Sequence, residues 1–307
     1  MQKCKIIDTI IRPYFLLKRI FLHSLDLFIP NKMRRKHVRA YLTFGKIKET
    51  INPQPYSHKI AVAFCFDENL WRQATVTILS LLINSPKVSY DIYCITNVSH
   101  THLARIKKIV NQYTKRSTIT FLKPNKDFSK SYCGAWSDAI YWRCMLPKLL
   151  PNVERIIYAD VDTVFTSDLR DADKITMGDN LIAGVYDKPG REYINSGFMI
   201  MNLNCMRRRC TYNEMIKWSR NHETQFPDQD MLNAVCAGRI MNISRKFNLQ
   251  IDGAYDALKT MTLQQRRDLK SPVMLHYAGP QKPWKMEIRK FYSFDIWRRY
   301  ASMTGLF

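Results

Sequence analysis

Blocks of apolar residues recur along the middle of the chain, and the spacing within each block predicts either a strand or a helix. Residues 59–66 form an apolar run of strand length, and residues 70–83 have the spacing of an amphipathic helix that Ser85 and Pro86 end. The same order continues with strands predicted at 90–96, 118–122 and 155–159 and helices at 101–113 and 137–149. This alternation predicts an α/β fold whose mixed, mostly parallel central sheet is flanked by helices.

The alternation becomes less regular after residue 159. Further strands are predicted at 181–186, 198–201 and 273–276, and further helices at 205–221 and 229–237. This part of the chain shows no internal repeat and no Gly-rich linker, so residues 58–284 are predicted to form a single domain.

The two ends of the chain are basic and differ in composition from the middle. Residues 1–57 combine Lys and Arg with apolar residues at helical spacing, which predicts a basic amphipathic extension. Charged residues interrupt this segment too often for a membrane span or a cleaved signal peptide. Residues 285–307 form a basic, aromatic tail. For each end, two interpretations stay open: contact with an anionic membrane, or a helix packed on the main domain.

The net charge limits the classes of partner to be expected, and the cysteine usage indicates the type of compartment. A net charge of +22 indicates a polyanionic partner such as an anionic membrane, a phosphorylated substrate or nucleic acid. The eight cysteines include no C-x-x-C pair and several stand in apolar runs, which is typical of a reducing compartment and argues against zinc or a disulfide framework.

Two acids follow the strand predicted at 155–159, in the sequence Asp160-Val161-Asp162. Carboxylates this close repel each other, so their position at the end of a buried strand favours a bound divalent cation or a shared proton. The simpler interpretation is that they are two polar residues that cap the following turn.

Other short segments carry groups suited to binding a phosphorylated ligand. They are Phe66-Asp67-Glu68-Asn69 after the first strand, Arg143 in the helix before the D-x-D, Tyr193-Ile194-Asn195-Ser196-Gly197, Phe226-Pro227-Asp228-Gln229-Asp230, and the block from His276 to Trp284 with Gly279 and Lys282. Each segment alone is explained as well by helix capping or turn formation.

Together and in this order, the segments resemble glycosyltransferase family 8, which includes bacterial lipopolysaccharide galactosyl- and glucosyltransferases. The resemblance covers residues 59–284 and rests on the D-x-D, the N-S-G strand, the D-Q-D helix start and the H-Y-x-G-x-x-K-P-W block. It implies a GT-A-type single domain and a manganese or magnesium ion held by Asp160, Asp162 and His276.

The resemblance also implies how a UDP-sugar donor is bound. The donor contacts would come from Asp67, Asn69, Arg143, Asp160, Val161, Asn195, Gly279 and Lys282. Within this set, Asp67 and Asn69 would contact the uridine, and Gly279 and Lys282 the phosphates. Arg143, Asp187, Asn195 and Asp228 would contact the sugar, with Gln229 beneath the anomeric carbon.

Family 8 enzymes retain the anomeric configuration. The residue beneath the anomeric carbon helps to distinguish the two mechanisms that give retention, double displacement and front-face attack. A double displacement needs a carboxylate there, whereas Gln229 is an amide and a poor nucleophile. Front-face attack, with the departing phosphate taking the acceptor's proton, is therefore favoured. Asp187 or Asp228 as a transient nucleophile stays open.

The resemblance thus implies a hexosyltransferase that moves galactose or glucose from a UDP-sugar to a lipid-linked or lipopolysaccharide-type oligosaccharide. We expect it on the cytoplasmic face of the inner membrane, held near anionic lipid by its basic ends. Two alternatives remain: a haloacid dehalogenase-type phosphatase with Asp160 as nucleophile, and a basic binding module for membrane or nucleic acid. No nucleic-acid-binding motif is present, so nucleic acid is not an expected partner.

Overall fold

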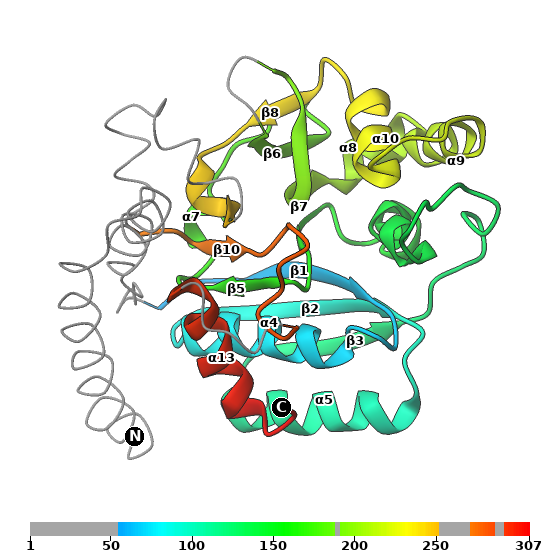
Figure 1. Cartoon of the computed structure of the whole chain (residues 1–307). Coiled ribbons are helices and arrows are strands. Elements are labelled where there is room, and N and C mark those ends of the chain that lie inside the picture. The colour runs from blue at the N-terminus through cyan, green and yellow to red at the C-terminus, as the bar shows by residue number, and fades with distance from the viewer. Residues whose placement is uncertain (1–54, 188–190, 252–270, 286–291) are drawn as a thin grey trace, which may run out of the picture. The chain divides into compact units, whose positions relative to one another are not determined.

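A computed structural model describes residues 55–187, 191–251, 271–285 and 292–307 (Figure 1). These residues belong to one compact unit. The extension predicted over residues 1–57 lies outside the described residues except for positions 55–57. No helix in the described ranges is long and apolar enough to cross a membrane.

A seven-stranded mixed sheet forms the centre of the fold, in the order β3-β2-β1-β4-β7-β6-β8 (Figure 1). Its strands are β1 (Lys59–Phe66), β2 (Ser89–Thr96), β3 (Thr118–Leu122), β4 (Arg155–Ala159), β6 (Ile182–Tyr186), β7 (Ile194–Asn202) and β8 (Ile240–Asn242). The first four are parallel, and β7 runs antiparallel to both β4 and β6. The prediction of a mixed, mostly parallel sheet is confirmed.

A second, three-stranded sheet brings distant parts of the chain together. Its order is β5 (Thr163–Phe165), β10 (Met274–His276) and β9 (Leu249–Gln250). Strands β5 and β10 are antiparallel, with His276 opposite Thr163. Because Thr163 directly follows Asp162, this pairing places the late His block beside the D-x-D.

Helices cover both faces of the central sheet. They are α4 (Trp71–Ile83), α5 (His100–Tyr113), η2 (Asp138–Met145), α6 (Leu146–Leu149), α7 (Arg170–Asp173), α8 (Leu203–Arg208), α9 (Thr211–Asn221), α10 (Pro227–Val235), η3 (Arg245–Phe247) and α13 (Tyr292–Thr304). Helices α4 and α5 lie on one face, whereas η2, α8, α9 and α10 contribute to the core on the other.

Two predicted helices are each divided in the structure. The helix predicted at 137–149 begins as the 3-10 helix η2, and α6 starts with Pro147 in its first turn. Proline has no N–H, so it cannot donate the bond that would continue one α-helix across this point. The helix predicted at 205–221 is two helices, α8 and α9, because Cys210 adopts a left-handed conformation with φ of 55°.

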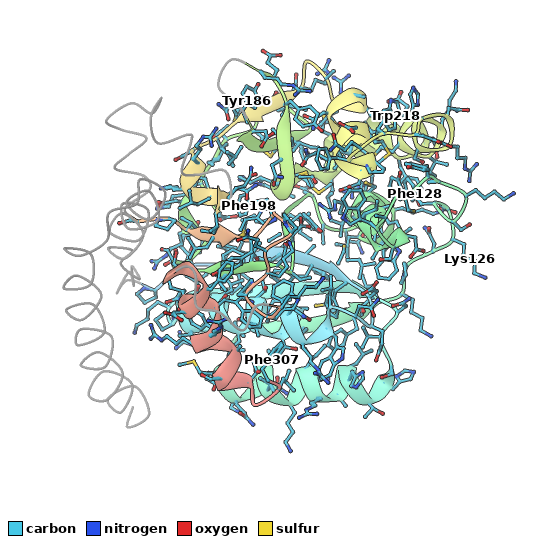
Figure 2. The ribbon with its side chains drawn as sticks, in the orientation of Figure 1. Lys126, Phe128, Tyr186, Phe198, Trp218 and Phe307 are labelled. Atoms are coloured by element: carbon cyan, nitrogen blue, oxygen red, sulfur yellow. The ribbon has the colours of Figure 1, made fainter. Side chains whose placement is uncertain are left out.

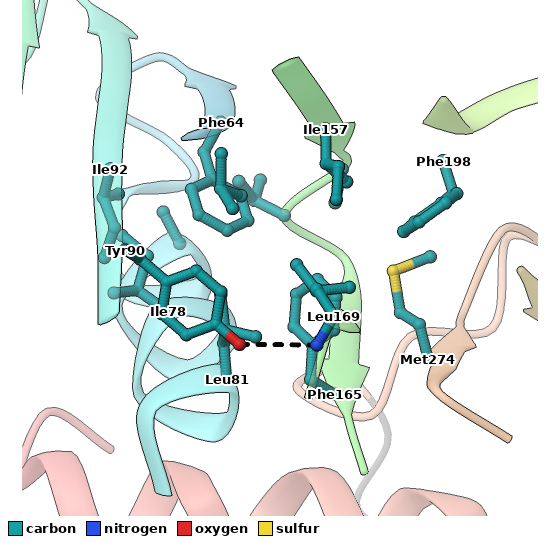
Figure 3. Packing of buried hydrophobic residues seen from close by; sticks show 14 of the residues in the cluster. Phe64, Ile78, Leu81, Tyr90, Ile92, Ile157, Phe165, Leu169, Phe198 and Met274 are labelled. Atoms are coloured by element: carbon teal, nitrogen blue, oxygen red, sulfur yellow. Dashed lines mark hydrogen bonds between the residues drawn. The ribbon is translucent and has the colours of Figure 1, made fainter. Parts of the chain in front are cut away.

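The core on the α4 side packs apolar side chains from three layers (Figure 3). Phe64 and Ile92 of the sheet meet Ile78 of α4, and Phe165 of β5 closes the cluster with its ring perpendicular to that of Phe64. The buried hydroxyl of Tyr90 accepts a hydrogen bond from the Leu169 N–H at 3.4 Å. Five cysteines are buried as free thiols, as their apolar surroundings in the sequence predict: Cys65, Cys94, Cys144, Cys205 and Cys236.

The aromatic tail is largely packed on the domain. Helix α13 contacts α4 and β5, and its side chains Phe294, Trp297 and Tyr300 are buried. Asn84 at the end of α4 donates a hydrogen bond to the Tyr300 hydroxyl at 2.7 Å. These aromatic residues are therefore unavailable to a membrane, and the packed-helix interpretation describes them. Phe307 at the end of the chain stays exposed (Figure 2).

Candidate active site

The D-x-D lies in the loop between β4 and β5, and main-chain bonds fix its course. The buried hydroxyl of Thr77 on α4 lies within hydrogen-bonding distance of two loop carbonyls, 2.9 Å from Val161 O and 2.8 Å from Thr163 O. The Asp160 N–H donates to Gly197 O of β7 at 3.0 Å. The loop is held from both sides, so the two carboxylates project from a rigid base.

His276 and the two acids of the D-x-D converge on one point. Asp160, Asp162 and His276 each offer a ligand atom within 4.8 Å of the others. His276 Nε2 lies 3.3 Å from Asp162 Oδ1 and 3.9 Å from Asp160 Oδ2. Two carboxylate oxygens and an imidazole nitrogen are a donor set for a divalent cation.

The remaining oxygen of each carboxylate is bound by neighbouring side chains. Asp160 Oδ1 accepts a hydrogen bond from the Tyr158 hydroxyl at 2.6 Å and lies 2.8 Å from Arg143 Nη2. Asp162 Oδ2 lies 2.6 Å from Lys282 Nζ, which also donates to Tyr277 O. Burial acts to raise the pKa of Asp162, but the adjacent His276 and Lys282 outweigh it and hold that pKa well below its usual value.

A chain of amide groups orients the imidazole of His276. Asn195 Oδ1 accepts the Gly197 N–H at 3.0 Å and Asn248 Nδ2 at 2.8 Å. Asn248 therefore turns its own oxygen toward His276 Nδ1, 2.9 Å away. In the neutral ring this partner places the proton on Nδ1, so Nε2 faces the carboxylates with its lone pair.

The same network continues to Gln229 at the start of α10. Gln229 Oε1 accepts the Ser196 N–H and the Asn195 amide, each at 3.0 Å. Its Nε2 donates to the Tyr193 hydroxyl at 3.1 Å, and that hydroxyl donates in turn to Asp230. The predicted residues Asn195 and Gln229 are therefore in direct contact, and both ends of the Gln229 amide are fixed.

Arg143 joins the D-x-D to the D-Q-D helix. Its guanidinium lies 2.8 Å from Asp160 and 3.3 Å from Asp228, stacks over the Tyr158 ring at 4.6 Å, and is only 6% exposed. Burial acts to lower the pKa of Arg143, but the nearby acids raise it well above the usual value. Burial raises the pKa of Asp228, and Arg143 partly offsets this. The guanidinium is thus occupied by protein carboxylates.

The remaining predicted residues stand in loops that follow strands of the fold. Asp67 and Asn69 occupy the turn after β1, where Asp67 accepts the Asn69 N–H and the Ser137 hydroxyl. Asp187 directly follows β6 and accepts a hydrogen bond from Gln250 at 3.3 Å. Gly279 lies in the loop between β10 and Lys282. Asp67 bonds within its own turn, whereas α4 begins after Leu70 without a side-chain cap, so the helix-capping interpretation of this segment is wrong.

Comparison with known proteins identifies the family. The model of the family described as glycosyl transferase family 8 matches residues 61–287, most of the chain. The chain belongs to glycosyltransferase family 8. This membership replaces the phosphatase and binding-module interpretations with glycosyl transfer.

Individual relatives agree with the family membership. A lipopolysaccharide 1,2-glucosyltransferase of Escherichia coli K12 is 26% identical over 74% of this chain and 73% of its own length. A lipopolysaccharide 1,3-galactosyltransferase of Salmonella typhimurium is 22% identical over 80% of both chains. The solved galactosyltransferase LgtC, in complex with donor and acceptor sugar analogs, superposes with a TM-score of 0.67 at 19% identity, covering 79% of this chain and 95% of that one. The predicted GT-A-type architecture is confirmed.

Several residues that shape the site carry no signal in the sequence. Asn248, which orients His276, stands 28 positions before it, and Thr77, which fixes the loop, lies inside an apolar helix. Tyr158 belongs to a buried strand. Only the fold brings these side chains to the site.

Proposed function

We propose that this family 8 enzyme is a metal-dependent retaining hexosyltransferase that uses a UDP-sugar donor. The observation that carries the proposal is the convergence of Asp160, Asp162 and His276, with Lys282 beside them. A nucleoside diphosphate needs both a cation between its phosphates and the carboxylates, and a further positive group near its outer oxygens. Asp160, Asp162 and His276 provide ligands for the cation, and the Lys282 amine provides the further positive group.

The donor set fits manganese or magnesium better than zinc. Each acid turns one oxygen toward His276 Nε2, while its other oxygen is held by Arg143, Tyr158 or Lys282. Oxygen ligands with a single imidazole suit Mn²⁺, and Asn248 supplies the outer hydrogen bond that fixes the His276 ring. A bound ion would neutralise the diphosphate and stabilise the charge that develops on the departing UDP.

Roles follow for the residues around the centre. Asp67 and Asn69 bind the uridine, Asp160 and Val161 lie along the nucleotide, and Gly279 and Lys282 contact the phosphates. Arg143, Asp187, Asn195 and Asp228 hold the donor sugar, Arg143 chiefly by positioning the two acids to which it is bound. The sugar is galactose or glucose, since the relatives named above include transferases of both kinds.

The contacts of Gln229 and Asp228 favour front-face attack. Gln229 is held by protein groups at both ends of its amide, so it serves to position the sugar. Asp228 is buried and bound by Arg143 and Ser196, which leaves its carboxylate poorly placed as a nucleophile. The acceptor oxygen forms the new bond to the anomeric carbon as the bond to the phosphate oxygen breaks, and that oxygen takes the acceptor's proton. Asp187 remains the open candidate for a covalent intermediate.

An exposed aromatic pair supports a saccharide acceptor. Trp136 is 48% exposed and Phe226 is 43% exposed, with ring centroids 6.2 Å apart. Trp136 precedes Ser137, which is bonded to Asp67, and Phe226 immediately precedes the D-Q-D helix. Aromatic rings offer flat apolar surface to the C–H face of a sugar. The relatives named above are lipopolysaccharide glycosyltransferases, which supports a lipopolysaccharide-type oligosaccharide as the acceptor. The proposal extends to a lipid-linked acceptor that the enzyme meets at the cytoplasmic face of the inner membrane.

A panel of UDP-sugars tests the function. We expect Mn²⁺-dependent hydrolysis of UDP-glucose or UDP-galactose, with the other hexose turned over more slowly and activity lost on chelation. Asp162→Asn should abolish both turnover and Mn²⁺-dependent UDP binding measured by calorimetry, because it removes a ligand charge. Asp179→Asn, at an acid away from the cluster, is the matched control. Hydrolysis that does not depend on the metal, or activity retained in Asp162→Asn, would contradict the assignment.

A further inference from the structure

Residues 92–126 contain no Asp or Glu. They hold seven basic residues: Arg105, Lys107, Lys108, Lys115, Arg116, Lys123 and Lys126. This stretch forms the end of β2, all of α5 and all of β3, and β3 is the outermost strand of the central sheet. We call this surface the α5–β3 edge. Helix α5 runs along the lower side of the coloured ribbon in Figure 1.

The positive charge of the α5–β3 edge is not compensated within the domain. All seven basic side chains are exposed, and none has an ion-pair or hydrogen-bond partner among the residues that the structure describes. Lysines elsewhere on the surface differ, since Lys148 pairs with Asp127 and Lys246 with Asp171. A concentrated, unpaired positive surface attracts an extended polyanion.

Exposed aromatic residues lie at one end of this edge. Tyr113, the last residue of α5, is 40% exposed, and Phe307 is 54% exposed (Figure 2). The two chain segments meet where the Tyr113 hydroxyl donates to Met303 O at 3.3 Å. The other large exposed hydrophobic side chains in the described ranges, Tyr132, Trp136 and Phe226, belong to the loop before η2 and to the segment before α10. Aromatic side chains beside lysines are typical of surfaces that contact the headgroup region of a bilayer.

A cavity opens at the other end of the edge, between α5 and the end of β3. It encloses about 530 Å³ and has Leu103, Phe121 and Leu122 among its apolar lining residues. Lys107 and Lys123 line it from α5 and from the end of β3, and no acid is among the lining residues. A lining that combines apolar side chains with two amines fits a group that is anionic at one end and apolar at the other.

We propose that the α5–β3 edge docks on an anionic bilayer and that the cavity receives the phosphate of a lipid headgroup. The apolar lining of the cavity favours lipid over nucleic acid, whose phosphates would need the charge alone. The docking proposal rests on the proposed function in one respect: docking would give the enzyme access to a lipid-linked acceptor.

The edge also connects to the donor side of the active site. Glu68, between Asp67 and Asn69, accepts the Ser99 N–H at 3.0 Å and is bonded to the His102 ring, both at the start of α5. The cavity and the donor turn thus lie at the carboxyl ends of neighbouring parallel strands. Docking through this edge would bring the active-site end of the sheet to the lipid surface.

Lysine footprinting of the full chain tests the docking surface directly. Acetylation is followed by mass spectrometry with vesicles of phosphatidylglycerol, with vesicles of phosphatidylcholine and without lipid. We expect Lys107, Lys108, Lys115 and Lys123 to react roughly fivefold more slowly with the anionic vesicles alone. Lys130 and Lys217, exposed lysines outside the edge, should keep their rates. The proposal would be overturned if the control lysines were protected equally, or if the four lysines of the edge were not protected.

A charge-matched pair of variants gives the second measurement. Lys107→Gln/Lys108→Gln/Lys123→Gln should lower partitioning onto phosphatidylglycerol vesicles roughly a hundredfold. Lys130→Gln/Arg208→Gln/Lys217→Gln removes the same charge from exposed positions elsewhere and should bind as the wild type does. Equal partitioning of the two variants would overturn the proposal. So would protection of the four lysines by a single-stranded oligonucleotide but not by vesicles.

Hydrolysis of UDP-sugar without vesicles separates this proposal from the proposed function. Both triple variants should hydrolyse the donor at the wild-type rate, because none of their substitutions touches the donor site. A wild-type chain that docks without hydrolysing any UDP-sugar refutes the function and leaves the docking surface standing. The reverse result refutes the docking surface alone.

Discussion

The imidazole of His276 packs against the backbone of Gly197, in the space where any other residue would place its β-carbon. A Cβ added to Gly197 would overlap the ring and lie 2.6 Å from Nδ1 and 2.9 Å from Asn195 Oδ1. Both neighbours belong to the amide network that orients His276. The glycine of the N-S-G motif is therefore required by the position of the His276 ring.

Gly197→Ala should displace His276 and weaken metal-dependent UDP binding by at least about a hundredfold, since loss of ligand orientation alone costs roughly 10- to 100-fold. Calorimetry with and without Mn²⁺ measures it. Gly184→Ala is the control, because its Cβ would crowd Ile194 and not the site. We expect that variant to lose stability but keep metal-dependent binding. Equal UDP binding by wild type and Gly197→Ala would contradict the steric argument.

Asn248→Ala should raise the Mn²⁺ concentration that half-saturates UDP binding by roughly 10- to 100-fold, because it removes the partner of His276 Nδ1. Activity should recover when Mn²⁺ is in excess, which distinguishes a positioning residue from a catalytic one. Asn233→Ala also removes a buried amide, one bonded to main-chain atoms of β7 and α10. It should lower Tm without changing the metal requirement. A loss in Asn248→Ala that excess metal does not rescue would count against this role.

Arg143→Met should destabilise the fold by about 3–5 kcal/mol near neutral pH, because it leaves the buried Asp228 and the partly buried Asp160 without their cation. The loss should shrink on acidification. Burial already raises the pKa of Asp228, and removing Arg143 raises it further. A carboxyl whose pKa is higher in the folded than in the unfolded state binds protons preferentially when folded, so stability falls as pH rises through that range.

Urea unfolding at about pH 5 and about pH 7.5 measures the effect of Arg143→Met. Arg155→Met is the control, since the Arg155 guanidinium donates to the main-chain oxygen of Ala172 at 2.8 Å and not to a carboxylate. Its cost should change little between the two pH values. A pH-independent cost in Arg143→Met would show that Asp228 does not take up the proton.

Trp136→Ala and Phe226→Ala should each raise the KM for a saccharide acceptor about tenfold, which corresponds to roughly 1.4 kcal/mol. Alkyl glucosides and galactosides serve as acceptors in the assay. Hydrolysis of UDP-sugar in their absence should stay at the wild-type rate. Tyr113→Ala, at another exposed aromatic residue, on α5, should change neither value. An unchanged acceptor KM in both site variants would exclude the aromatic pair from acceptor binding.

Local patterns in the sequence predict the central architecture and the candidate metal ligands Asp160, Asp162 and His276. Apolar runs and helical spacing are local properties, so β1, β3 and β4 were predicted with the bounds that the structure shows. The D-x-D and the His276 block were recognisable because their residue types and order are specific. Short strands such as β5 and β9 left no comparable signal, since two or three residues form a strand only through their partners.

The way these groups come together depends on the three-dimensional fold. Pairing of β5 with β10 brings His276 to the D-x-D across more than a hundred residues, and Asn248 then fixes the ring. Arg143 was predicted to contact the donor sugar. In the structure it contacts Asp160 and Asp228, which come together only because the fold places η2, the β4–β5 loop and α10 side by side. The tail's aromatic residues fitted a membrane or a core equally well until α13 was seen packed on α4. Such contacts join positions that are distant in the chain, so local sequence patterns do not predict them.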